Sequence, residues 1–404
     1  MSSIHYDAII IGSGICGTST AFHLTLRGAK KVLVLEQGSL CSGTTSHAPG
    51  LVGQLRADKA LMSLLRTSVA FYAEHGDGGY QGVGSLRLAS SADRWQEIQK
   101  QKNAADEAGL PCELLSLEET LSRFPHFDPQ GVEGSLFVRS DGSADAVAIT
   151  TAIRKRALAA GVEFREHSPV TAFGRNSVTA AGQTYSAPAI LLATGVWSWP
   201  LGKLAGVQLP VVPMQHQVVW SEDLPWLDQA NPLPNLRDPD LLVYLRQNGR
   251  KLVVGGYERD PRPFNPLEIL SNTPRPTEQR FDAAHFKSLL ENARVRVPAL
   301  RDESLAFTRT LNGIESFTPD GHFLLGPLPQ VEGLWAACGF CAHGVSGSGG
   351  VGKLMADWIT DGRPSIPVPG MEVSRYQDKE LSFEDAADSV CAIYSTYYDI
   401  DKSV

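Results

Sequence analysis

The sequence has few cysteines, no long apolar run and no basic cluster, and each absence excludes a class of protein. Six cysteines among 404 residues are too few and too scattered for the disulfide framework of a secreted protein. No apolar run reaches the ~18 residues that a membrane span needs, so we expect no membrane association. The net charge of −8, without a basic run, argues against a nucleic-acid partner.

The cysteine spacing and the N-terminus narrow the options further. Cys338 and Cys341 are separated by two residues, but no second Cys or His pair lies at zinc-finger spacing, so structural cysteines are favoured and no metal site is predicted. A strand begins within the first six residues, which leaves no room for a signal peptide. We therefore expect a reduced, cytoplasmic protein.

A glycine-rich turn lies between a predicted strand and a predicted helix near the N-terminus. The apolar run Tyr6–Ile11 leads into Gly12, Gly14 and Gly17, and Thr18–Arg27 follows as a helix. Gly12 allows the turn, Gly14 lets the backbone approach a pyrophosphate, and Gly17 allows close packing of helix on strand. The helix N-terminus favours an anion there. The pattern predicts a dinucleotide site.

An acidic residue at the end of the next strand restricts the nucleotide. The predicted strand Lys31–Leu35 is followed by Glu36, 19 residues after Gly17. A carboxylate at this place suits a ribose diol and repels a 2′-phosphate. The ligand should therefore be FAD or NAD, and not NADP.

The length and a composition of 43% hydrophobic and 20% charged residues predict two domains with sizeable cores. We expect an α/β fold, α+β overall, in which a Rossmann-like FAD-binding domain joins a discontinuous substrate domain with a mainly antiparallel sheet. The predicted ranges are 1–80, 145–200 and 315–375 for the FAD-binding domain, 81–144 and 201–314 for the substrate domain, and 376–404 for a C-terminal extension.

Several local assignments depend on turn residues and periodicity. Gly79–Ala89 is predicted as a strand, and the sequence Asp141-Gly142-Ser143 as a turn. The proline-rich segments 232–239 and 261–276 are predicted as surface loops between strands. The glycine-rich segment 339–352 is expected to lead into a final helix over Lys353–Thr360.

Five motifs then give the chain a family resemblance from about residue 5 to 380. They are Gly43-Thr44-Thr45-Ser46-His47-Ala48-Pro49-Gly50-Leu51-Val52, Pro213-Met214-Gln215-His216-Gln217, Tyr244-Leu245-Arg246-Gln247, Asn312-Gly313-Ile314-Glu315-Ser316-Phe317-Thr318-Pro319-Asp320-Gly321, and Gly349-Gly350-Val351-Gly352-Lys353. The chain resembles the flavoprotein half of dimethylglycine oxidase and dimethylglycine dehydrogenase, within the superfamily of D-amino-acid oxidase and sarcosine oxidase.

The resemblance implies FAD as cofactor and a covalent bond to it through His47. The family histidine of this motif bonds the flavin 8α-methyl group, and His47 stands at its place. The alternative is a loop histidine that caps a backbone carbonyl. Relatives that attach flavin through a late cysteine carry it just upstream of a Pro-Asp pair, where this chain has Asn312-Gly313-Ile314 and no cysteine.

The resemblance also implies the other cofactor contacts. The three glycines of the turn would hold the flavin together with residues from several loops and from the start of the last helix. These residues are Ile15, Cys16, Glu36, Gln37, Ser46, Ala48, Pro49, Gly50, Val170, Gly195, Gly344, Val345, Ser346, Gly347 and Ser348.

Two catalytic and three substrate-binding candidates follow from the same resemblance. His216 and Tyr244 stand at positions that face the flavin in the relatives, and a histidine suits proton handling near neutral pH. A structural strand histidine and an ordinary half-buried aromatic are the alternatives. Arg246 and Tyr257 are candidates for a substrate carboxylate, and Arg246 shares a face with Tyr244 only if the strand is regular. His343 would lie over the ring or cap the turn.

The implied activity is FAD-dependent oxidative demethylation of an N-methylated amino acid, by hydride transfer to flavin N5 and hydrolysis of the iminium. Dimethylglycine, sarcosine, a methylated γ-amino acid and a betaine-derived amine all stay open, as does the electron acceptor. The dimethylglycine enzymes continue into a folate-binding half beyond the point where this sequence stops. We therefore also consider a flavin subunit without its own activity, which passes electrons to an electron-transfer flavoprotein or partner subunit. A nicotinamide enzyme is the third possibility.

Overall fold

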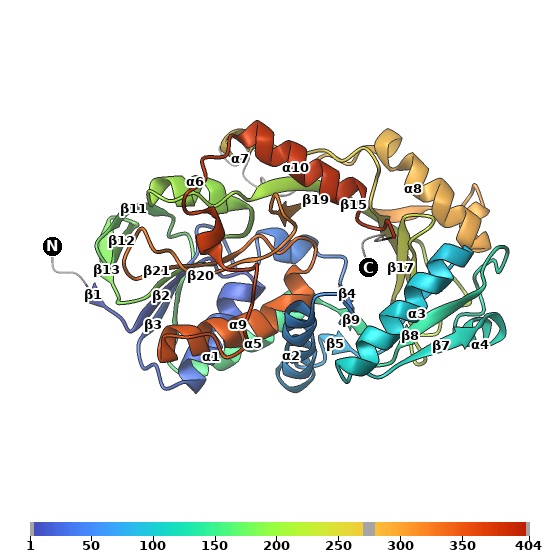
Figure 1. The fold of residues 1–404 in the computed structure, drawn as a ribbon, viewed down its shortest axis with the longest axis horizontal. Helices are drawn as coiled ribbons and strands as arrows, with labels where there is room; N and C mark the ends of the chain where they lie inside the picture. The colour runs from blue at the N-terminus through green and yellow to red at the C-terminus, as the bar shows by residue number, and fades with distance from the viewer. Residues whose placement is uncertain (1–3, 270–278, 401–404) are drawn as a thin grey trace.

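The computed structural model describes residues 4–269 and 279–400, and it confirms the predicted combination of an α/β fold with antiparallel-rich sheets. Figure 1 shows a layered region, with α1 (Ile15–Leu26) and α9 (Gly344–Asp361) below it, beside a second region that ends in α3 (Ala92–Glu107) and α4 (Leu117–Arg123). Within these two ranges, no helix has both the length and the apolar character that crossing a membrane requires.

A six-stranded sheet forms the centre of the layered region. In spatial order its strands are β10 (Glu163–Arg165), β3 (Val32–Leu35), β2 (Ala8–Ile11), β14 (Ile190–Leu192), β21 (Leu334–Cys338) and β20 (Leu324–Pro327). All neighbours are parallel except β20, which is antiparallel to β21. Both faces of the sheet are covered, which explains why β2 and β3 are apolar at every position.

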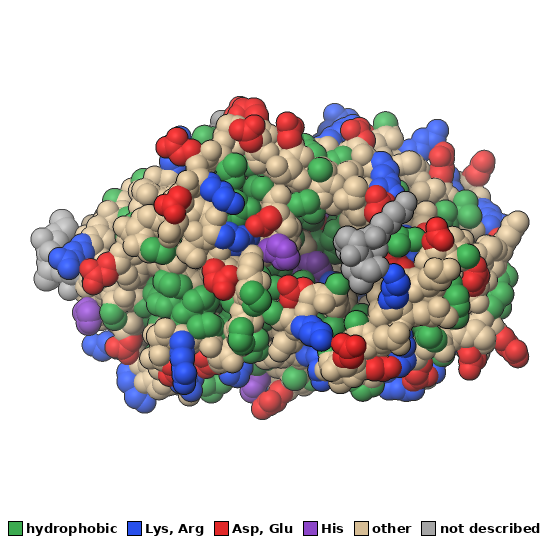
Figure 2. All heavy atoms as spheres, viewed as in Figure 1, with side chains coloured by type: hydrophobic (Ala, Val, Ile, Leu, Met, Phe, Trp, Pro, Cys, Tyr) green, Lys and Arg blue, Asp and Glu red, His purple; other side chains and the backbone are tan. Residues whose placement is uncertain are grey.

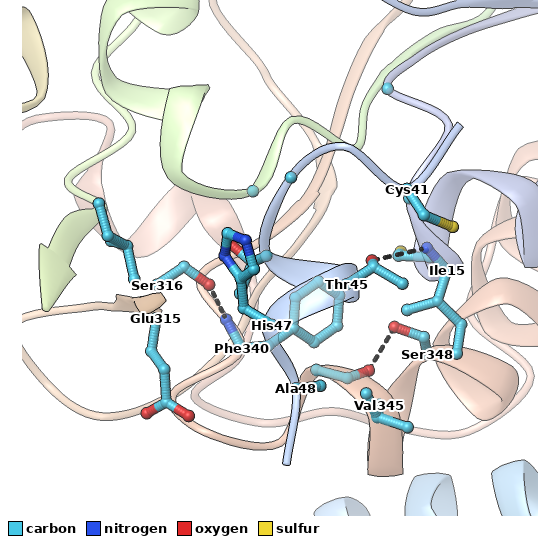
Figure 3. A pocket seen from close by; sticks show the side chains of 18 of the residues that line it. Ile15, Cys41, Thr45, His47, Ala48, Glu315, Ser316, Phe340, Val345 and Ser348 are labelled. Carbon is cyan, nitrogen blue, oxygen red and sulfur yellow. Dashed lines mark hydrogen bonds between the residues drawn. The ribbon is translucent and has the colours of Figure 1, made fainter. Parts of the chain in front are cut away.

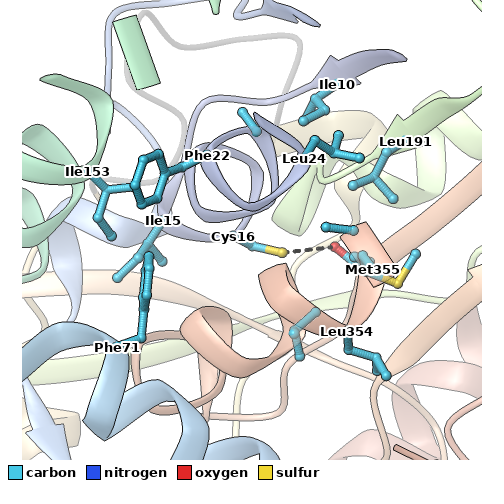
Figure 4. Packing of buried hydrophobic residues seen from close by; sticks show 14 of the residues in the cluster. Ile10, Ile15, Cys16, Phe22, Leu24, Phe71, Ile153, Leu191, Leu354 and Met355 are labelled. Atoms are coloured by element: carbon cyan, nitrogen blue, oxygen red, sulfur yellow. Dashed lines mark hydrogen bonds between the residues drawn. The ribbon is translucent and has the colours of Figure 1, made fainter. Parts of the chain in front are cut away.

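The two faces of this sheet pack against different layers. On β2, Ile10 points to a layer of helices and Ile9 to a small sheet. The helices are α1, α9, α5 (Ala146–Ala159) and α2 (Lys59–His75), and Figure 4 shows how α1 packs through Phe22 against the neighbouring helices. The small sheet consists of β1 (Ile4–His5), β13 (Gln183–Ser186), β12 (Ser177–Ala180) and β11 (Val170–Gly174).

The last helix begins much earlier than its predicted body, Lys353–Thr360. α9 starts at Gly344, because its glycines allow it to pack closely on α1 and α2. A Cβ atom added at Gly350 would lie 2.1 Å from the carbonyl oxygen of Leu64 on α2. Tertiary packing therefore outweighs the low helix propensity of glycine.

The second region is built on an eight-stranded mixed sheet. In order its strands are β19 (Phe307–Phe317), β15 (Val212–Ser221), β18 (Lys251–Gly256), β17 (Val243–Asn248), β16 (Asn235–Asp238), β6 (Ser85–Ala89), β8 (Gly134–Val138) and β7 (Cys112–Ser116). Every pair is antiparallel except β16 with β6. Helix α8 (Ala283–Arg296) packs on one face through Phe286 and Leu289, within a core that includes Leu245 and Val254.

The loop predicted for residues 232–239 is wrong in its second half. Asn235–Asp238 forms β16, which pairs with β6 on one side and β17 on the other. Prolines flank the strand at both ends, and a proline-rich composition is typical of a surface loop. Long-range pairing decided its conformation, and this cannot be seen from local composition.

The turn predicted at Asp141-Gly142-Ser143 is also wrong. Gly142–Ala144 forms β9, the middle strand of a three-stranded sheet with β4 (Leu51–Val52) and β5 (Tyr80–Gln81). A Cβ atom at Gly142 would lie 2.0 Å from the carbonyl oxygen of Gln81, so this glycine permits a close strand approach. The single strand predicted over Gly79–Ala89 is likewise two strands, β5 and β6.

The remaining elements are short or lie near the C-terminus. The predicted loop 261–276 contains the short helix α7 (Pro266–Ile269), and its part from residue 270 on lies outside the described residues. Helix α6 (Ser198–Leu204) comes after β14 in the chain. Helix α10 (Phe383–Ser395), in the predicted C-terminal extension, lies across the top of the molecule beside β15 (Figure 1).

Candidate active site

A single long cavity extends from the ends of β2 and β3 to the face of the eight-stranded sheet. It is lined by segments from both regions, including Gly12, Glu36, His47, Tyr244 and Glu315. In the space-filling view, the face shown is hollowed near its centre, where histidine side chains reach the surface (Figure 2). The position after the carboxyl ends of parallel strands is where open α/β sheets bind ligands.

The glycine turn between β2 and α1 has the geometry that its sequence predicts. Gly12 has a φ of +104°, and a Cβ atom there would lie 2.4 Å from the carbonyl oxygen of Ala193. Gly14, Ile15 and Cys16 line the cavity at the N-terminus of α1. Gly17 does not line it, because it packs against the carbonyl of Gly12, which is its expected role.

The end of β3 forms one extremity of the cavity. The Glu36 carboxylate accepts hydrogen bonds of 2.8 Å from the Ser13 amide, 3.0 Å from the Ser13 hydroxyl and 2.9 Å from the Gly38 amide. Gln37 and Val170 line the same end, as predicted. A nucleoside placed here would meet a fixed carboxylate and an apolar wall.

The loop that carries His47 crosses the middle of the cavity. It contains the short 3-10 helix η1 (Thr44–His47), and His47, Ala48, Pro49 and Gly50 all line the cavity (Figure 3). Ser46 does not line it, since its hydroxyl donates to the carbonyl of Gly43 over 2.9 Å. This is one predicted cofactor contact that the structure does not bring to the cavity.

Two residues that were not assigned a role hold this loop in place. The Thr45 hydroxyl accepts a hydrogen bond of 3.2 Å from the Ile15 amide and thereby ties η1 to the start of α1. Gly313 on β19 faces His47, and a Cβ atom at Gly313 would lie 3.0 Å from the His47 Cβ. The glycine of the Asn-Gly-Ile-Glu motif thus makes room for the histidine.

The N-terminus of α9 forms the cavity wall near His47. Gly344, Val345, Ser346 and Ser348 line the cavity, and Figure 3 shows Val345 and Ser348 beside Ala48. Gly347 packs against Phe323 and does not line it. The first amides of α9 have no partner within the helix, so this end favours negative charge on a bound group. Gly195, after β14, also lines the cavity.

His216, in the middle of β15, is hydrogen-bonded to two tyrosines. Its Nε2 lies 2.6 Å from the Tyr244 hydroxyl and its Nδ1 3.0 Å from the Tyr394 hydroxyl. Tyr394 donates its own proton to the Gln215 carbonyl or the Glu258 carboxylate, so it accepts from His216, and Tyr244 donates to the other nitrogen. Burial lowers the pKa of His216 to about 4, and the ring is neutral at neutral pH.

Tyrosines form the wall beside this histidine. Tyr244 and Tyr257 line the cavity with Tyr397, which follows α10 and stacks on Tyr257 with a ring-centroid distance of 3.9 Å. Burial raises the pKa of both Tyr244 and Tyr257 well above the ordinary value, so both hydroxyls stay protonated. Tyr397 lies in the predicted extension and was not assigned to the site, because nothing in its local sequence links it to the sheet.

Arg246 and His343 do not line the cavity. Strand β17 is regular, so Arg246 shares the face of Tyr244, but its guanidinium donates to the carbonyl of Pro49 and supports the His47 loop. His343 donates from Nδ1 to the Cys341 carbonyl over 2.6 Å and accepts at Nε2 from Arg56, also over 2.6 Å. Burial, followed by the charge of Arg56, lowers the pKa of His343 well below its ordinary value.

Two other arginines line the cavity instead. Arg56 donates a hydrogen bond to His343, and Arg237 lies on β16, the strand that was predicted as a proline-rich loop. Among the described residues, neither guanidinium forms an ion pair with a carboxylate within 4 Å. Burial opposes the charge on Arg237, but the surrounding tyrosines, Tyr398 first, raise its pKa. The cavity therefore offers two charged donors to an anion.

Two buried acids lie near His216. Glu315, on β19, lines the cavity, and its Oε2 lies 3.9 Å from His216 Nδ1. Burial, followed by the charge of Glu258, raises the pKa of Glu315 to about 8. Burial also raises the pKa of Glu258 to about 7. The motif that contains Glu315 was recognised in the sequence, but its side chain was not assigned a role.

These features fit a flavin dinucleotide. The cavity passes a nucleoside end at Glu36, the N-terminus of α1 and the N-terminus of α9, and it is open at Gly14 and Gly344, where an added Cβ would meet no backbone atom within 4 Å. A group with a ribose, a diphosphate and an electron-accepting ring matches these three places in order. The fold and the cavity therefore define a flavoprotein of the Rossmann type, with a sheet that closes over the flavin end.

Comparison with known proteins gives the family. The family model for the FAD dependent oxidoreductases matches residues 7–358, and the chain belongs to this family. It is 33% identical to the mitochondrial sarcosine dehydrogenase of Homo sapiens over 92% of its own length, and 32% identical to the formaldehyde-forming 4-methylaminobutanoate oxidase of Paenarthrobacter nicotinovorans, also over 92%. The family resemblance read from the motifs is thereby confirmed.

The chain spans less than half the length of these relatives, 41% and 46% respectively. Among solved structures, the fold is similar to L-proline dehydrogenase from P. horikoshii, with a TM-score of 0.84 and 22% identity. That match covers 94% of this chain and 100% of the other. It shows that the two chains share this fold over nearly their whole length.

Proposed function

We propose that this chain oxidises the N-methyl group of an N-methylated amino acid, with FAD as cofactor, and that hydrolysis of the product releases formaldehyde and the demethylated amine. The observation that carries the proposal is the cavity beyond His47, which presents a buried acid, three tyrosines and two guanidinium groups that form no ion pair within 4 Å among the described residues. Such a lining suits a small molecule with a carboxylate and a methylated amine. The names of the two relatives support this substrate class.

In this proposal Glu36 binds a ribose, the N-terminus of α1 binds the diphosphate, and the His47 loop and the start of α9 hold the ring. Bound FAD supplies the acceptor for a hydride from the carbon beside the amine nitrogen. The chain contributes position and the exclusion of water. Helix dipoles at the start of α9 favour a ring that gains negative charge.

We further propose that His47 is covalently bonded to the flavin. The histidine lines the cavity on a loop fixed by Thr45 and accommodated by Gly313. The test is acid precipitation of purified protein followed by peptide mass mapping. Colour in the pellet on the His47 peptide is the expected result, and His47→Ala should release all flavin to the supernatant. Release of the flavin from the unchanged protein would refute the proposed covalent bond and would not affect the proposed oxidation.

The substrate carboxylate is assigned to Arg237 and Arg56, in place of Arg246, because only the first two line the cavity. Tyr244, Tyr257 and Tyr397 pack around the methylated end, and aromatic faces favour alkylated ammonium groups. His216 fixes the hydroxyl of Tyr244 through their 2.6 Å hydrogen bond. These contacts hold the N-methyl carbon toward the flavin end of the cavity.

The experiment is a substrate series with formaldehyde measured against substrate consumed. Sarcosine and dimethylglycine have one carbon between the amine and the carboxylate, N-methyl-β-alanine has two and 4-methylaminobutanoate has three. One formaldehyde per substrate, with a clear optimum in chain length, is expected. Arg237→Ala should lower kcat/KM by about 10- to 100-fold, since hydrogen bonds to charged groups contribute about 1.5–3 kcal/mol. Yellow protein inert to the whole series, with copurifying chains, would instead indicate a subunit without activity of its own.

A further inference from the structure

Glu315 is an ionisable side chain of the cavity to which no step of the reaction is assigned above. It lies on β19 opposite Met214 of β15, and its side chain is 14% exposed. Figure 3 shows its carboxylate at the cavity, pointing away from the His47 ring. Its Oε2 is buried and has no hydrogen-bond partner among the described residues. Burying an acceptor without a partner costs free energy, so a ligand donor is expected here.

The groups that face Glu315 supply no positive charge. They come from β15, β17, the segment after β18, and α10, and they are His216, Tyr244, Tyr257, Glu258 and Tyr394. His216 is neutral, and both its nitrogens are engaged by tyrosine hydroxyls. The charges of both Glu315 and Arg237 act on the pKa of the Tyr244 hydroxyl, and all three residues line the cavity.

We propose that Glu315 binds the amine end of the substrate and takes its proton, which rests on the proposed oxidation of an N-methylated amino acid. When the ammonium binds, Glu315 releases its own proton to solvent and pairs with the ligand as a carboxylate. The N–H bond of the ammonium then breaks and an O–H bond forms on a Glu315 oxygen, and the electron pair stays on nitrogen. The free pair then assists loss of the hydride from the neighbouring carbon. The zwitterion is held between Glu315 at one end and Arg237 at the other.

Glu315 is better suited to this step than His216. The lone pair of His216 Nε2 is occupied by the Tyr244 proton, and burial disfavours a charged ring, with the pKa lowered to about 4. For Glu315, burial and the neighbouring Glu258 favour the protonated carboxyl, with the pKa raised to about 8. A carboxyl that is stable in its neutral form can keep the proton while the amine reacts. His216 then acts by positioning Tyr244.

The test measures ligand binding to the holoenzyme and requires no turnover. Trimethylglycine carries a permanent positive charge and no lone pair on nitrogen, while (methylthio)acetate has the same carboxylate and an uncharged sulfur. The pair 4-(trimethylammonio)butanoate and 4-(methylthio)butanoate repeats the comparison for a longer chain. Calorimetry in buffers of different ionisation enthalpy gives the affinity and the protons released. Glu315→Gln keeps the shape of the side chain, and Glu303→Gln, at an exposed site, is the control for net charge.

The unchanged protein should release a proton when it binds a trimethylammonium ligand near pH 7 and none with the thioether. Glu315→Gln should weaken the trimethylammonium ligand by at least about 10-fold, abolish the proton release, and leave thioether affinity within about twofold. Glu303→Gln should change neither. Equal effects of Glu315→Gln on both ligands, or no effect on either, would overturn the role of Glu315. In that case, thioether binding that Arg237→Ala weakens would still support the proposed substrate class. Failure of the unchanged protein to bind any of the four ligands would overturn both.

Discussion

The two ends of the cavity are built in different ways. The cofactor end is made of residues that are neighbours in the chain, chiefly 14–16, 36–37, 41–45, 47–50 and 344–346. The substrate end is made of single side chains from distant strands, such as Arg237, Tyr244 and Glu315. The first end needs a particular chain path. The second needs particular charges, held in place by neighbours.

This difference teaches where each end is vulnerable. At the cofactor end a single added methyl group can collide with backbone that has no room to move. At the substrate end the cost of a change depends on which buried charge or hydroxyl loses its partner. Substitutions at the two ends should therefore fail in different measurements.

The largest effect is expected for Gly12→Ala. Its Cβ would lie 2.4 Å from the Ala193 carbonyl oxygen, at a φ of +104°. We expect protein that retains almost no flavin, measured as the ratio of visible to ultraviolet absorbance. Gly28→Ala is the control, because Gly28 has a similar φ of +94° but nothing within 4 Å of the added atom. Equal flavin retention in both variants would show that the collision is not decisive.

The next largest effect tests the support of Arg237. Arg296 Nε lies 2.6 Å from Asp238 Oδ2, with side chains only 4% and 0% exposed. Arg296→Leu leaves the Asp238 carboxylate buried without its partner, and breaking such a pair costs about 3–5 kcal/mol. Arg301→Ala breaks an ion pair that is 49% and 23% exposed and should cost less than about 1 kcal/mol. Urea unfolding of both variants measures the difference, and similar values would contradict this account.

A smaller effect concerns the pH dependence of stability. The pKa of Glu315 is raised from 4.5 to about 8 in the folded chain, so the folded state binds more protons than the unfolded one in this interval. The stabilisation is complete below pH 4.5 and is lost as pH rises through 8. The variant Glu315→Gln has no ionisable group at this position, so its stability should not show this decrease with rising pH. Relative to the variant, the unchanged protein should therefore weaken from pH 5 to 8, by on the order of 2 kcal/mol.

His216 gives the opposite sign and serves as the internal comparison. Its pKa is lowered from 6.5 to about 4, so the unfolded state binds more protons between these values. Its contribution is complete above pH 6.5 and is lost as pH falls toward 4. Denaturant midpoints of the unchanged protein and of Glu315→Gln, measured across pH 4 to 8, should separate the two slopes. Parallel curves for the unchanged protein and Glu315→Gln would contradict the buried acid.

The smallest effect is expected for Tyr394→Phe, which removes one hydroxyl from α10. The change leaves His216 Nδ1 without its acceptor at 3.0 Å and frees Glu258 from its 3.2 Å bond. At about 1 kcal/mol per hydrogen bond, kcat/KM should fall roughly fivefold and its pH profile should shift. Tyr6→Phe, which removes a hydroxyl bonded to Glu163 far from the cavity, should leave the profile unchanged.

The structure brings nearly all of the predicted cofactor residues to one cavity, and their binding of the cofactor stays a prediction. Of these residues only Ser46 and Gly347 point elsewhere, and Gly17 has the packing role that its spacing implies. The reason is physical: a tight turn, an acid at a strand end and a helix N-terminus are local structures whose residues are neighbours in the chain. The two-domain boundaries stay a prediction.

At the substrate end, His216, Tyr244 and Tyr257 line the cavity. The resemblance had pointed to the first two, and the roles of all three stay predictions. Arg237 was hidden in a strand flanked by prolines, and Tyr397 lies more than a hundred residues from its stacking partner Tyr257.

The sequence by itself determined the fold class, the nucleotide turn and the family. Only the tertiary structure decided which arginine faces the cavity and that Glu315 lies there without a counter-charge, because strand order and long-range packing, which local sequence does not encode, bring these side chains together.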